Sequence, residues 1–459
     1  MHRLWHLRSR WVLGVAAVLL FVPPPGDGAA PLPSRPPSAR PDILIVTVDT
    51  LRADRLGSYG YARKTSPQLD RLLKGGVRFS QARVVEPLTN PSICSMMTSL
   101  YPQDHGASRN GLRMRRGLAS LPKSLSDHGY DTAAIVGNWT LKNKLSGLGE
   151  HFDDYESLLT RKRWFGFLRS EATAADLTAA AIEWLDDHRA DGSNRPFMLW
   201  VHYVEPHAPY RFQEEFAEPL GLAVDSKKLP PSDRYDTEVA FVDHAIGRLI
   251  REVESQLDSP PLILFASDHG ESLGEHDYWG HGRNLYEPGL RIPMGLTWRG
   301  RIPAGVVHAP ALNIDLAPTI LSLLDIPIPT SFRGYDWADA LNGGSTPDDR
   351  VTHYQAHRGA VISKHESELA RRKGLLAVGL IDGTLKEILV VGSGKREIWN
   401  LENDPGELTN LAETHSAASD DLAGWTQAVD TGLTSLDELP PEPLDDASAA
   451  QLRALGYVD

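Results

Sequence analysis

Polar residues of types that can bind metal ions stand directly after several apolar runs of the sequence. Asp49 follows DILIVTV, Asp268 and His269 follow LILFAS, and His207 comes shortly after FMLWVHYV. Carboxylates and neutral imidazoles are ligands for zinc, manganese or calcium, in different mixtures. Because the backbone curls where a strand ends, the adjacent Asp268 and His269 can both reach one ion. The pattern indicates a functional site at the strand ends.

Thr89 opens the stretch TNPSICSMMTSL, which we expect to form a short helix. Asn90 is a good N-cap, and Pro91 suits the first helical position. Such a start directs free N–H groups and the positive end of the helix dipole at whatever lies beside Thr89. Two interpretations stay open: Thr89 is a neighbour of the cap, or it is a nucleophile aimed at an anion.

The richest stretch is ASDHGESLGEHDYWGHGRNLYEPGLRIP, whose glycines predict a loop with tight turns. His276 and His281 lie five residues apart in this loop, and either could supply a further imidazole. His276 is equally well explained as a surface residue. His281 stands between two glycines, and we favour a functional role for it.

Four apolar runs alternate with helical patterns such as 174–192 and 237–257. This alternation predicts a doubly wound, mostly parallel α/β sheet flanked by helices. In such sheets ligands bind beyond the carboxyl ends of the strands, where the polar residues stand. Short strand-like runs within 351–404 and a final helix over 417–433 predict a small C-terminal α+β subdomain.

The 459-residue chain has a net charge of -13, which argues against a nucleic-acid groove, and its one cysteine excludes an intramolecular disulfide. Residues 1–30 have the layout of a signal peptide, followed by a Pro-rich linker over 31–40. We therefore expect a secreted or periplasmic protein without a stable membrane span, an uncleaved signal anchor being the alternative. The expected catalytic domain is 41–345, with the subdomain over 346–459.

Motifs along most of the chain after residue 40 resemble the sulfatase family of the alkaline phosphatase superfamily. They include VDTLRADRLGSYGY, TSLYPQDHG, HYVEPHAPY, SDHGESLGEH and IWNLENDPGELTNLAE. The resemblance implies an alkaline-phosphatase-like fold and hydrolysis of sulfate or phosphate esters with one or two divalent ions. Asp49, Asp268 and His269 fall on metal-ligand positions. His207 falls on a position that contacts the substrate anion or protonates the leaving group, and Thr89 on that of the nucleophile.

The chain departs from the family at several positions. Most sulfatases carry a Cys or Ser where Thr89 stands, convert it to formylglycine, and have an arginine where this chain has Ile93. Asn138 and Thr140 occupy places of a lysine and a histidine that bind sulfate, and Thr50 replaces a second Asp. Threonine cannot give the aldehyde, so we expect Thr89 to act as a metal-activated hydroxyl.

We therefore expect a metal-dependent hydrolase of small-molecule or glycan sulfate or phosphate esters, using calcium, manganese or zinc. His207 or His281 would protonate the leaving group, Arg283 would clamp an ester oxygen, and Asn138 would contact substrate. Two alternatives stay open. One is a phosphodiesterase or phosphoryl transferase of the same superfamily, and the other is a non-catalytic, sulfatase-like glycan-binding protein.

Overall fold

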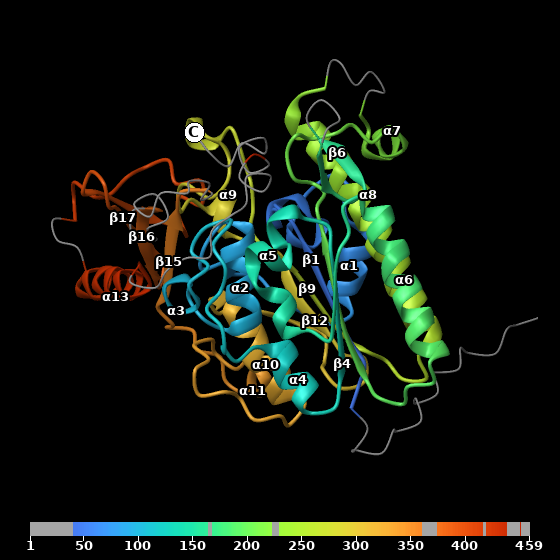
Figure 1. The fold of residues 1–459 in the computed structure, drawn as a ribbon. Helices are drawn as coiled ribbons and strands as arrows, with labels where there is room; N and C mark the ends of the chain where they lie inside the picture. The colour runs from blue at the N-terminus through green and yellow to red at the C-terminus, as the bar shows by residue number, and fades with distance from the viewer. Residues whose placement is uncertain are drawn as a thin grey trace, which may run out of the picture. The chain divides into compact units, whose positions relative to one another are not determined.

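An eight-stranded, mostly parallel sheet forms the centre of the fold (Figure 1). The computed structural model describes residues 40–163, 168–222, 229–359, 374–415, 419–437 and 450. In sheet order the strands are β13 (Gly305–Val307), β2 (Val77–Phe79), β12 (Met294–Thr297), β9 (Leu262–Ser267), β1 (Ile43–Val48), β8 (Phe197–Tyr203), β4 (Asp131–Val136) and β5 (Asp154–Ser157). Only β12 runs antiparallel to its neighbours in this sheet. The predicted fold class is confirmed.

The register of the central strands brings the candidate site together. Val48, the last residue of β1, lies beside Tyr203 of β8 and Ser267 of β9. Because these strands are parallel, the residues that follow them meet at one edge of the sheet. Asp49 and Asp268 are the next residues after β1 and β9, so the pairing alone makes them neighbours.

Helices cover both faces of this sheet. Alternate residues of β1 face the two layers: Leu44, Val46 and Val48 belong to one apolar core, while Ile43 and Ile45 belong to the other. The first layer contains α1 (Pro67–Lys74), α6 (Ala174–Ala190) and α8 (Pro231–Gln256), and the second contains α2 (Thr89–Thr98), α4 (Leu121–Asp127) and α10 (Leu316–Leu323). The expected helix over 237–257 begins earlier, because Pro231 suits a first helical turn.

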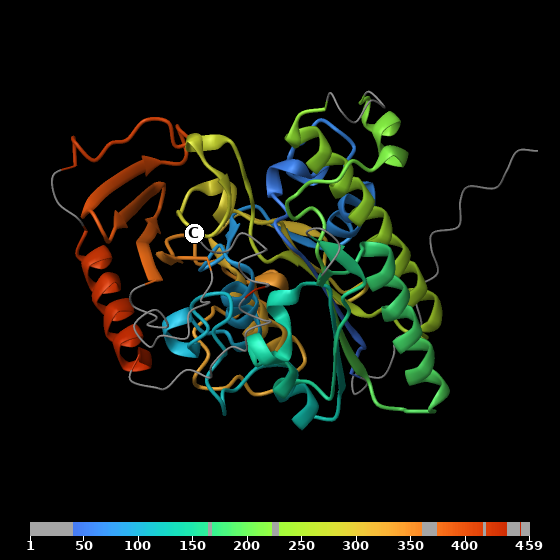
Figure 2. The same cartoon turned by 45° about the horizontal axis from the view of Figure 1, so that its top comes forward.

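A second, antiparallel sheet follows in the C-terminal part of the chain (Figure 2). It consists of β15 (Thr352–His357), β16 (Leu375–Asp382), β17 (Leu385–Val390) and β18 (Lys395–Asn400). One face packs on α13 (Asp420–Asp437) through Val378, Leu380 and Leu433, and the other joins the main core through residues such as Ile388. The expected C-terminal α+β subdomain is confirmed.

The remaining elements are short. The additional strands are β3 (Ala82–Arg83) with β14 (Ala311–Leu312), β6 (Arg161–Arg163) with β7 (Leu168–Glu171), and β10 (Ser272–Leu273) with β11 (Trp279–Gly280). The short helices are α3 (Pro102–His105), α5 (Asn143–Ser146), α7 (Glu214–Ala217), α9 (Glu287–Leu290) and α11 (Ala338–Leu341).

The expected signal peptide and linker, 1–30 and 31–40, lie outside the described residues except for Arg40. Export therefore stays a prediction. None of the helices in the described part of the chain is long and apolar enough to cross a membrane. Residues 40–459 form one compact unit, and the expected division between residues 345 and 346 also stays a prediction.

A buried charge cluster joins the C-terminal sheet to the loop that carries His276 and His281. Arg83 binds Glu287 of α9 through two nitrogens, at 2.9 and 2.8 Å. Lys386 of β17 contacts Glu287 at 3.1 Å and Glu407 at 2.7 Å. Two cations and two carboxylates therefore neutralise one another, and they hold the loop that carries the histidine candidates against β17.

We expect Lys386→Met to lower the free energy of unfolding by about 3 kcal/mol, because it leaves buried carboxylates without their cation. Lys395→Met is the matched control: Lys395 pairs with Glu397, but its side chain is 63% exposed, so the loss should stay below about 1 kcal/mol. Urea denaturation measures both. Equal losses in the two variants would contradict a stabilising role for the buried cluster.

Candidate metal centre and nucleophile

Two buried carboxylates stand side by side at the carboxyl edge of the central sheet. The Asp49 N–H donates to the carbonyl of Tyr203 at 2.9 Å, and the Asp268 N–H donates to that of Val48 at 3.2 Å. Asp268 Oδ1 accepts the N–H groups of Thr50 and His269 at 3.1 and 2.7 Å. These bonds fix the backbone of both residues and the carboxylate of Asp268, whose Oδ2 accepts no hydrogen bond from the described residues.

His269 presents a lone pair to both carboxylates. Its Nδ1 lies 2.9 Å from the carbonyl of Gly270, which can only accept, so the proton belongs on Nδ1. Its Nε2 lies 3.5 Å from Asp268 Oδ2 and 3.7 Å from Asp49 Oδ1. Burial lowers the pKa of His269 well below its usual range, and the nearby His281 lowers it further. A neutral imidazole is the form that binds metals.

The residues present fit a divalent cation. Asp49 Oδ1, Asp268 Oδ2 and His202 Nε2 are buried and have no hydrogen-bond partner among the described residues. One ligand atom from each of these residues lies within 4.8 Å of the other two. Burial raises the pKa of Asp268 well above its usual range, as does the Asp49 carboxylate. Because burying two unpaired carboxylates is costly, a cation between them would satisfy atoms that are otherwise orphaned.

The pKa of Asp49 shifts in the opposite direction. Burial alone raises the pKa of its carboxyl, but the imidazoles of His207, His202 and His269 outweigh this effect and hold its pKa below the usual range. Asp49 is therefore the carboxylate that is ionised first. The mixture of oxygen and imidazole donors is typical of zinc and manganese sites.

Sequence reasoning missed His202 as a candidate ligand. It lies within β8, opposite Thr47 of β1, and its Nδ1 is 2.8 Å from Thr47 Oγ1. A signal was present, because Thr47 and His202 are polar residues within otherwise apolar runs. That the two residues are paired depends on strand register, which the sequence does not specify.

Asn138 contacts the candidate metal ligand Asp49 in the structure, although we expected it to contact substrate. Its Nδ2 donates to Asp49 Oδ2. Its Oδ1 accepts from both the backbone N–H and the hydroxyl of Thr140, each at 2.9 Å. Both polar atoms of the amide are thus engaged, and it orients Asp49 from the β4 side. Its predicted contact with substrate stays a prediction.

Thr89 is the first residue of α2, and the predicted N-cap was wrong. Leu88 occupies the N-cap position. Asn90 lies inside the helix, where its Nδ2 donates to the carbonyls of Arg109 and Leu112 at 3.3 and 2.9 Å and its Oδ1, the atom that a cap would use, accepts from Cys94 Sγ at 3.4 Å. The fully buried Thr89 hydroxyl lies 3.3 Å from His269 Nε2. The structure therefore places this hydroxyl next to the candidate metal ligands.

His281 and His207 complete the cluster. Their ring centroids lie 5.2 Å apart, and the His281 ring is 4.4 Å from that of His269. His281 Nδ1 is 3.3 Å from Glu271 Oε2. Burial alone would lower the pKa of His281, but the Glu271 carboxylate outweighs this and raises it. Glu271 was missed by sequence reasoning, and it fixes the orientation of His281.

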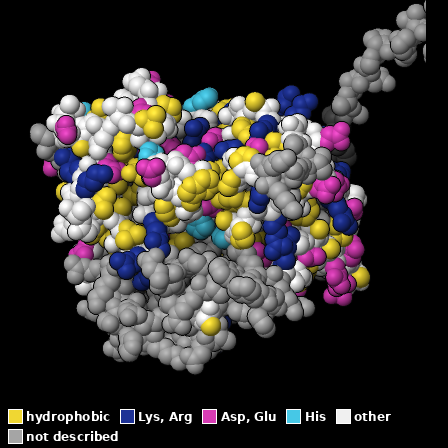
Figure 3. All heavy atoms as spheres, turned by 90° about the horizontal axis from the view of Figure 1, so that it is seen from above, with side chains coloured by type: hydrophobic (Ala, Val, Ile, Leu, Met, Phe, Trp, Pro, Cys, Tyr) yellow, Lys and Arg dark blue, Asp and Glu magenta, His cyan; other side chains and the backbone are white. Residues whose placement is uncertain are grey.

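The structure places two other candidates farther out. His276 stacks on Tyr286, with centroids 3.9 Å apart, so its role here is packing. The exposed Arg283 lies on the wall of a neighbouring cavity, directly after Gly282, which packs closely against Leu88. Its predicted clamp on an ester oxygen stays a prediction. On the face viewed in Figure 3, histidine side chains reach the surface among basic and apolar ones.

We expect Asp268→Asn to lose most of its bound divalent metal, because the amide brings no negative charge to the site. Asp243→Asn is a matched control: Asp243 is equally buried and accepts the N–H of Leu69 at 2.8 Å, in α1 away from the site. Elemental analysis of both purified variants measures the effect. Normal metal content in Asp268→Asn would refute the assignment.

Comparisons with known proteins agree with this geometry. The sulfatase family matches residues 41–326, and the family described as N-sulphoglucosamine sulphohydrolase, C-terminal, matches residues 274–423. The uncharacterized sulfatase YidJ of Escherichia coli K12 is 25% identical over 434 residues, which cover 82% of this chain and 83% of that protein.

Two solved structures share the fold at 20% identity. One is a protein solved in complex with its substrate, D-glucosamine-2-N,6-O-disulfate. Its TM-score is 0.66, and the match covers 88% of this chain and 99% of that chain. The other is a phosphonate monoester hydrolase from Silicibacter pomeroyi, with a TM-score of 0.64 over 86% of this chain and 96% of that chain. From the sequence match and the shared fold, the chain belongs to the sulfatase family and is an ester hydrolase of the alkaline phosphatase superfamily.

Proposed function

We propose that this ester hydrolase is metal-dependent and uses the unmodified Thr89 hydroxyl as its nucleophile. The observation that carries the proposal is the position of Thr89 Oγ1, 3.3 Å from His269 Nε2, which itself faces Asp49 and Asp268. A divalent cation held by Asp49, Asp268 and His269 would supply Lewis acidity, which lowers the pKa of a hydroxyl and offsets charge on ester oxygens.

The reaction would take place in two displacements. Thr89 Oγ forms a bond to the sulfur or phosphorus, while the bond from that atom to the alkoxide of the substrate breaks. The hydroxyl proton of Thr89 passes to solvent, and the departing alkoxide takes a proton from His281 and leaves as an alcohol. Water then attacks the threonine ester and gives one proton back to His281, so that sulfate or phosphate is released and the Thr89 hydroxyl is restored. The positive end of α2 favours the anionic group throughout.

His281 is positioned to give the leaving group its proton. Glu271 orients the ring through Nδ1, so Nε2 is the nitrogen that would donate the proton to the leaving group. His207 lies beside it and could bind an oxygen of the ester group or share the proton-donor role. The chain's own side chains thus supply a nucleophile, an acid and an anion-binding imidazole around one set of candidate metal ligands.

The substrate would be a small-molecule or glycan ester. A similar structure contains a sulfated glucosamine as substrate, which supports a sulfated sugar, while the similarity to a phosphonate monoester hydrolase supports a phosphoryl ester. A panel of aryl sulfate, aryl phosphate and aryl phosphodiester, each with calcium, manganese or zinc, separates these activities. Absence of turnover by the metal-loaded protein would favour the non-catalytic glycan-binding alternative.

We expect Thr89→Ala to lower kcat about 1000-fold or more, because the nucleophile is gone, while metal content stays normal. Thr89→Ser should keep partial activity, since the oxygen remains and only the methyl group that restricts the rotamer is lost. Steady-state kinetics on the best aryl ester and elemental analysis provide the two measurements.

The control is Thr98→Ala in the same helix. Thr98 is also fully buried, but its hydroxyl donates to the carbonyl of Cys94 at 2.7 Å. This variant loses a buried hydroxyl without touching the site, so its kcat should stay within about twofold of wild type. Full activity in Thr89→Ala would overturn the proposed mechanism.

A further inference from the structure

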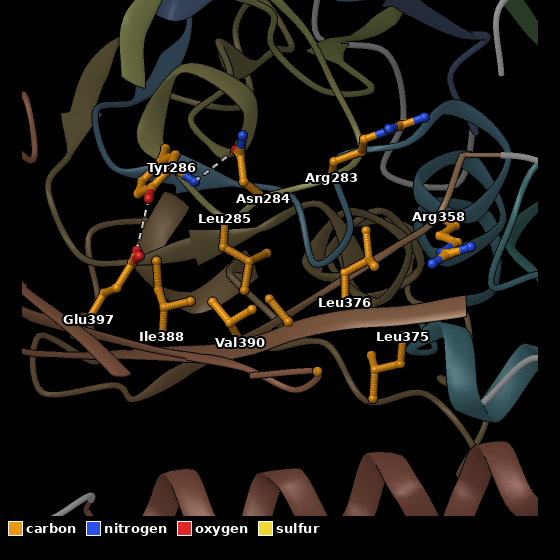
Figure 4. Close-up of a pocket in the computed structure, with 12 residues that line it drawn as sticks. Arg283, Asn284, Leu285, Tyr286, Arg358, Leu375, Leu376, Ile388, Val390 and Glu397 are labelled. Carbon is orange, nitrogen blue, oxygen red and sulfur yellow. Dashed lines mark hydrogen bonds between the residues drawn. The ribbon is translucent and has the colours of Figure 1, made fainter. Parts of the chain in front are cut away.

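A cavity of about 370 Å³ lies between the loop that follows His281 and the C-terminal sheet (Figure 4). This volume is in the range of small-molecule pockets. Leu285 projects into it from the loop, towards Leu376, Ile388 and Val390 on the sheet side. The wall between its two ends is therefore aliphatic.

One end of the cavity carries positive charge. Arg283 and Arg358 both line this end, and both are exposed. The Arg358 guanidinium makes no hydrogen bond or ion pair with a side chain in the described ranges. Burial, together with the nearby Arg358 cation, lowers the pKa of Arg109 to about 10. The Arg358 cation therefore raises the positive potential at this end of the cavity, and an anion bound to Arg358 would offset it.

The opposite end offers no free charge. Glu397 Oε2 accepts from the hydroxyl of Tyr286 at 2.9 Å, and Glu397 Oε1 pairs with Lys395 at 2.8 Å. The Asn284 side chain accepts the Tyr286 N–H at 3.3 Å. The Tyr286 ring stacks on His276. Because these polar groups are already paired, the cavity has few groups left to bind the hydroxyls of a sugar.

Hydrogen bonds and close packing connect the charged end to the nucleophile. Asn90, which follows Thr89, donates to the Arg109 carbonyl at 3.3 Å. The Arg109 Nε in turn donates to the carbonyl of Arg358 at 3.1 Å. On the other side, Gly282 precedes Arg283 and packs against Leu88, the residue before Thr89. Both arginines therefore belong to segments that contact the neighbours of Thr89.

We propose that this cavity binds the part of the substrate beyond the reacting ester, as an aryl or alkyl body with a second anionic group held by Arg358. The proposal that this body belongs to the substrate rests on the proposed function. The binding of an amphipathic anion in the cavity does not depend on the proposed function, and it can be measured without turnover.

The test is isothermal titration calorimetry of the full-length protein with three probes. 4-Biphenylcarboxylate has an apolar body and a negative charge, 4-biphenylmethanol has the apolar body alone, and glucuronate has the charge on a sugar. We expect 4-biphenylcarboxylate to bind at least about tenfold more tightly than either of the others, because only it has both an apolar body and a negative charge. Tighter binding of glucuronate would overturn the proposal in favour of a sugar subsite.

Three variants locate the binding. Arg358→Gln should weaken 4-biphenylcarboxylate about tenfold by removing the cation, and Leu376→Gln should weaken it similarly by making the wall polar. Arg251→Gln removes an exposed arginine from α8 and should bind the probe like wild type. Wild-type affinity in both Arg358→Gln and Leu376→Gln would place the probe elsewhere and refute the inference.

Turnover separates this inference from the proposed function. Phenyl phosphate and 4-carboxyphenyl phosphate, with the corresponding sulfates, differ only in the second anionic group. We expect the carboxylated ester to have the lower KM, and Arg358→Gln to reduce that preference about tenfold. If the probe binds as expected but no ester reacts, the proposed function fails and the cavity assignment stands. If esters react without this preference, the substrate assignment fails alone.

Discussion

The structure depends on the juxtaposition of two buried carboxylates at the edge of the central sheet. Asp49 and Asp268 follow parallel strands that share a register, and both are removed from water. The neutral His269 brings a lone pair rather than positive charge to the same place, and His202 lies beside both carboxylates. Such a cluster is stable only with a cation or a proton, so a divalent metal is the simplest partner for it. The placement of Thr89, His207 and His281 has meaning only relative to that position.

The surrounding structure holds this arrangement from two directions. Asn138, which follows β4, holds Asp49 Oδ2. Glu271 orients the ring of His281 from the loop. The loop itself is secured to the C-terminal sheet through the buried pair of Glu287 and Lys386. The second sheet therefore packs against the core and also holds the loop that carries His281. Residues of this loop and of the second sheet line the neighbouring cavity.

Much of the fold could be predicted from local patterns. The run that became β9 lies where it was expected, and the antiparallel C-terminal sheet follows from short apolar runs between turns. The positions of Asp49 and Asp268 at strand ends could also be predicted, because each residue directly follows an apolar run in the sequence. His202 and Glu271 were missed because their roles depend on strand register and loop curvature. The capping prediction for Asn90 failed because the helix begins one residue earlier, at Thr89, and carbonyl groups distant in sequence, at residues 109 and 112, hold the Asn90 side chain.

The central claim is that an unmodified threonine forms the covalent intermediate. The most direct test is peptide mass spectrometry of the metal-loaded protein, quenched by acid during turnover of its best aryl ester. The account predicts an intact threonine in the resting protein and one sulfuryl or phosphoryl group on Thr89 in the quenched sample. A modified residue 89 at rest, or the transferred group on any other residue, would contradict it.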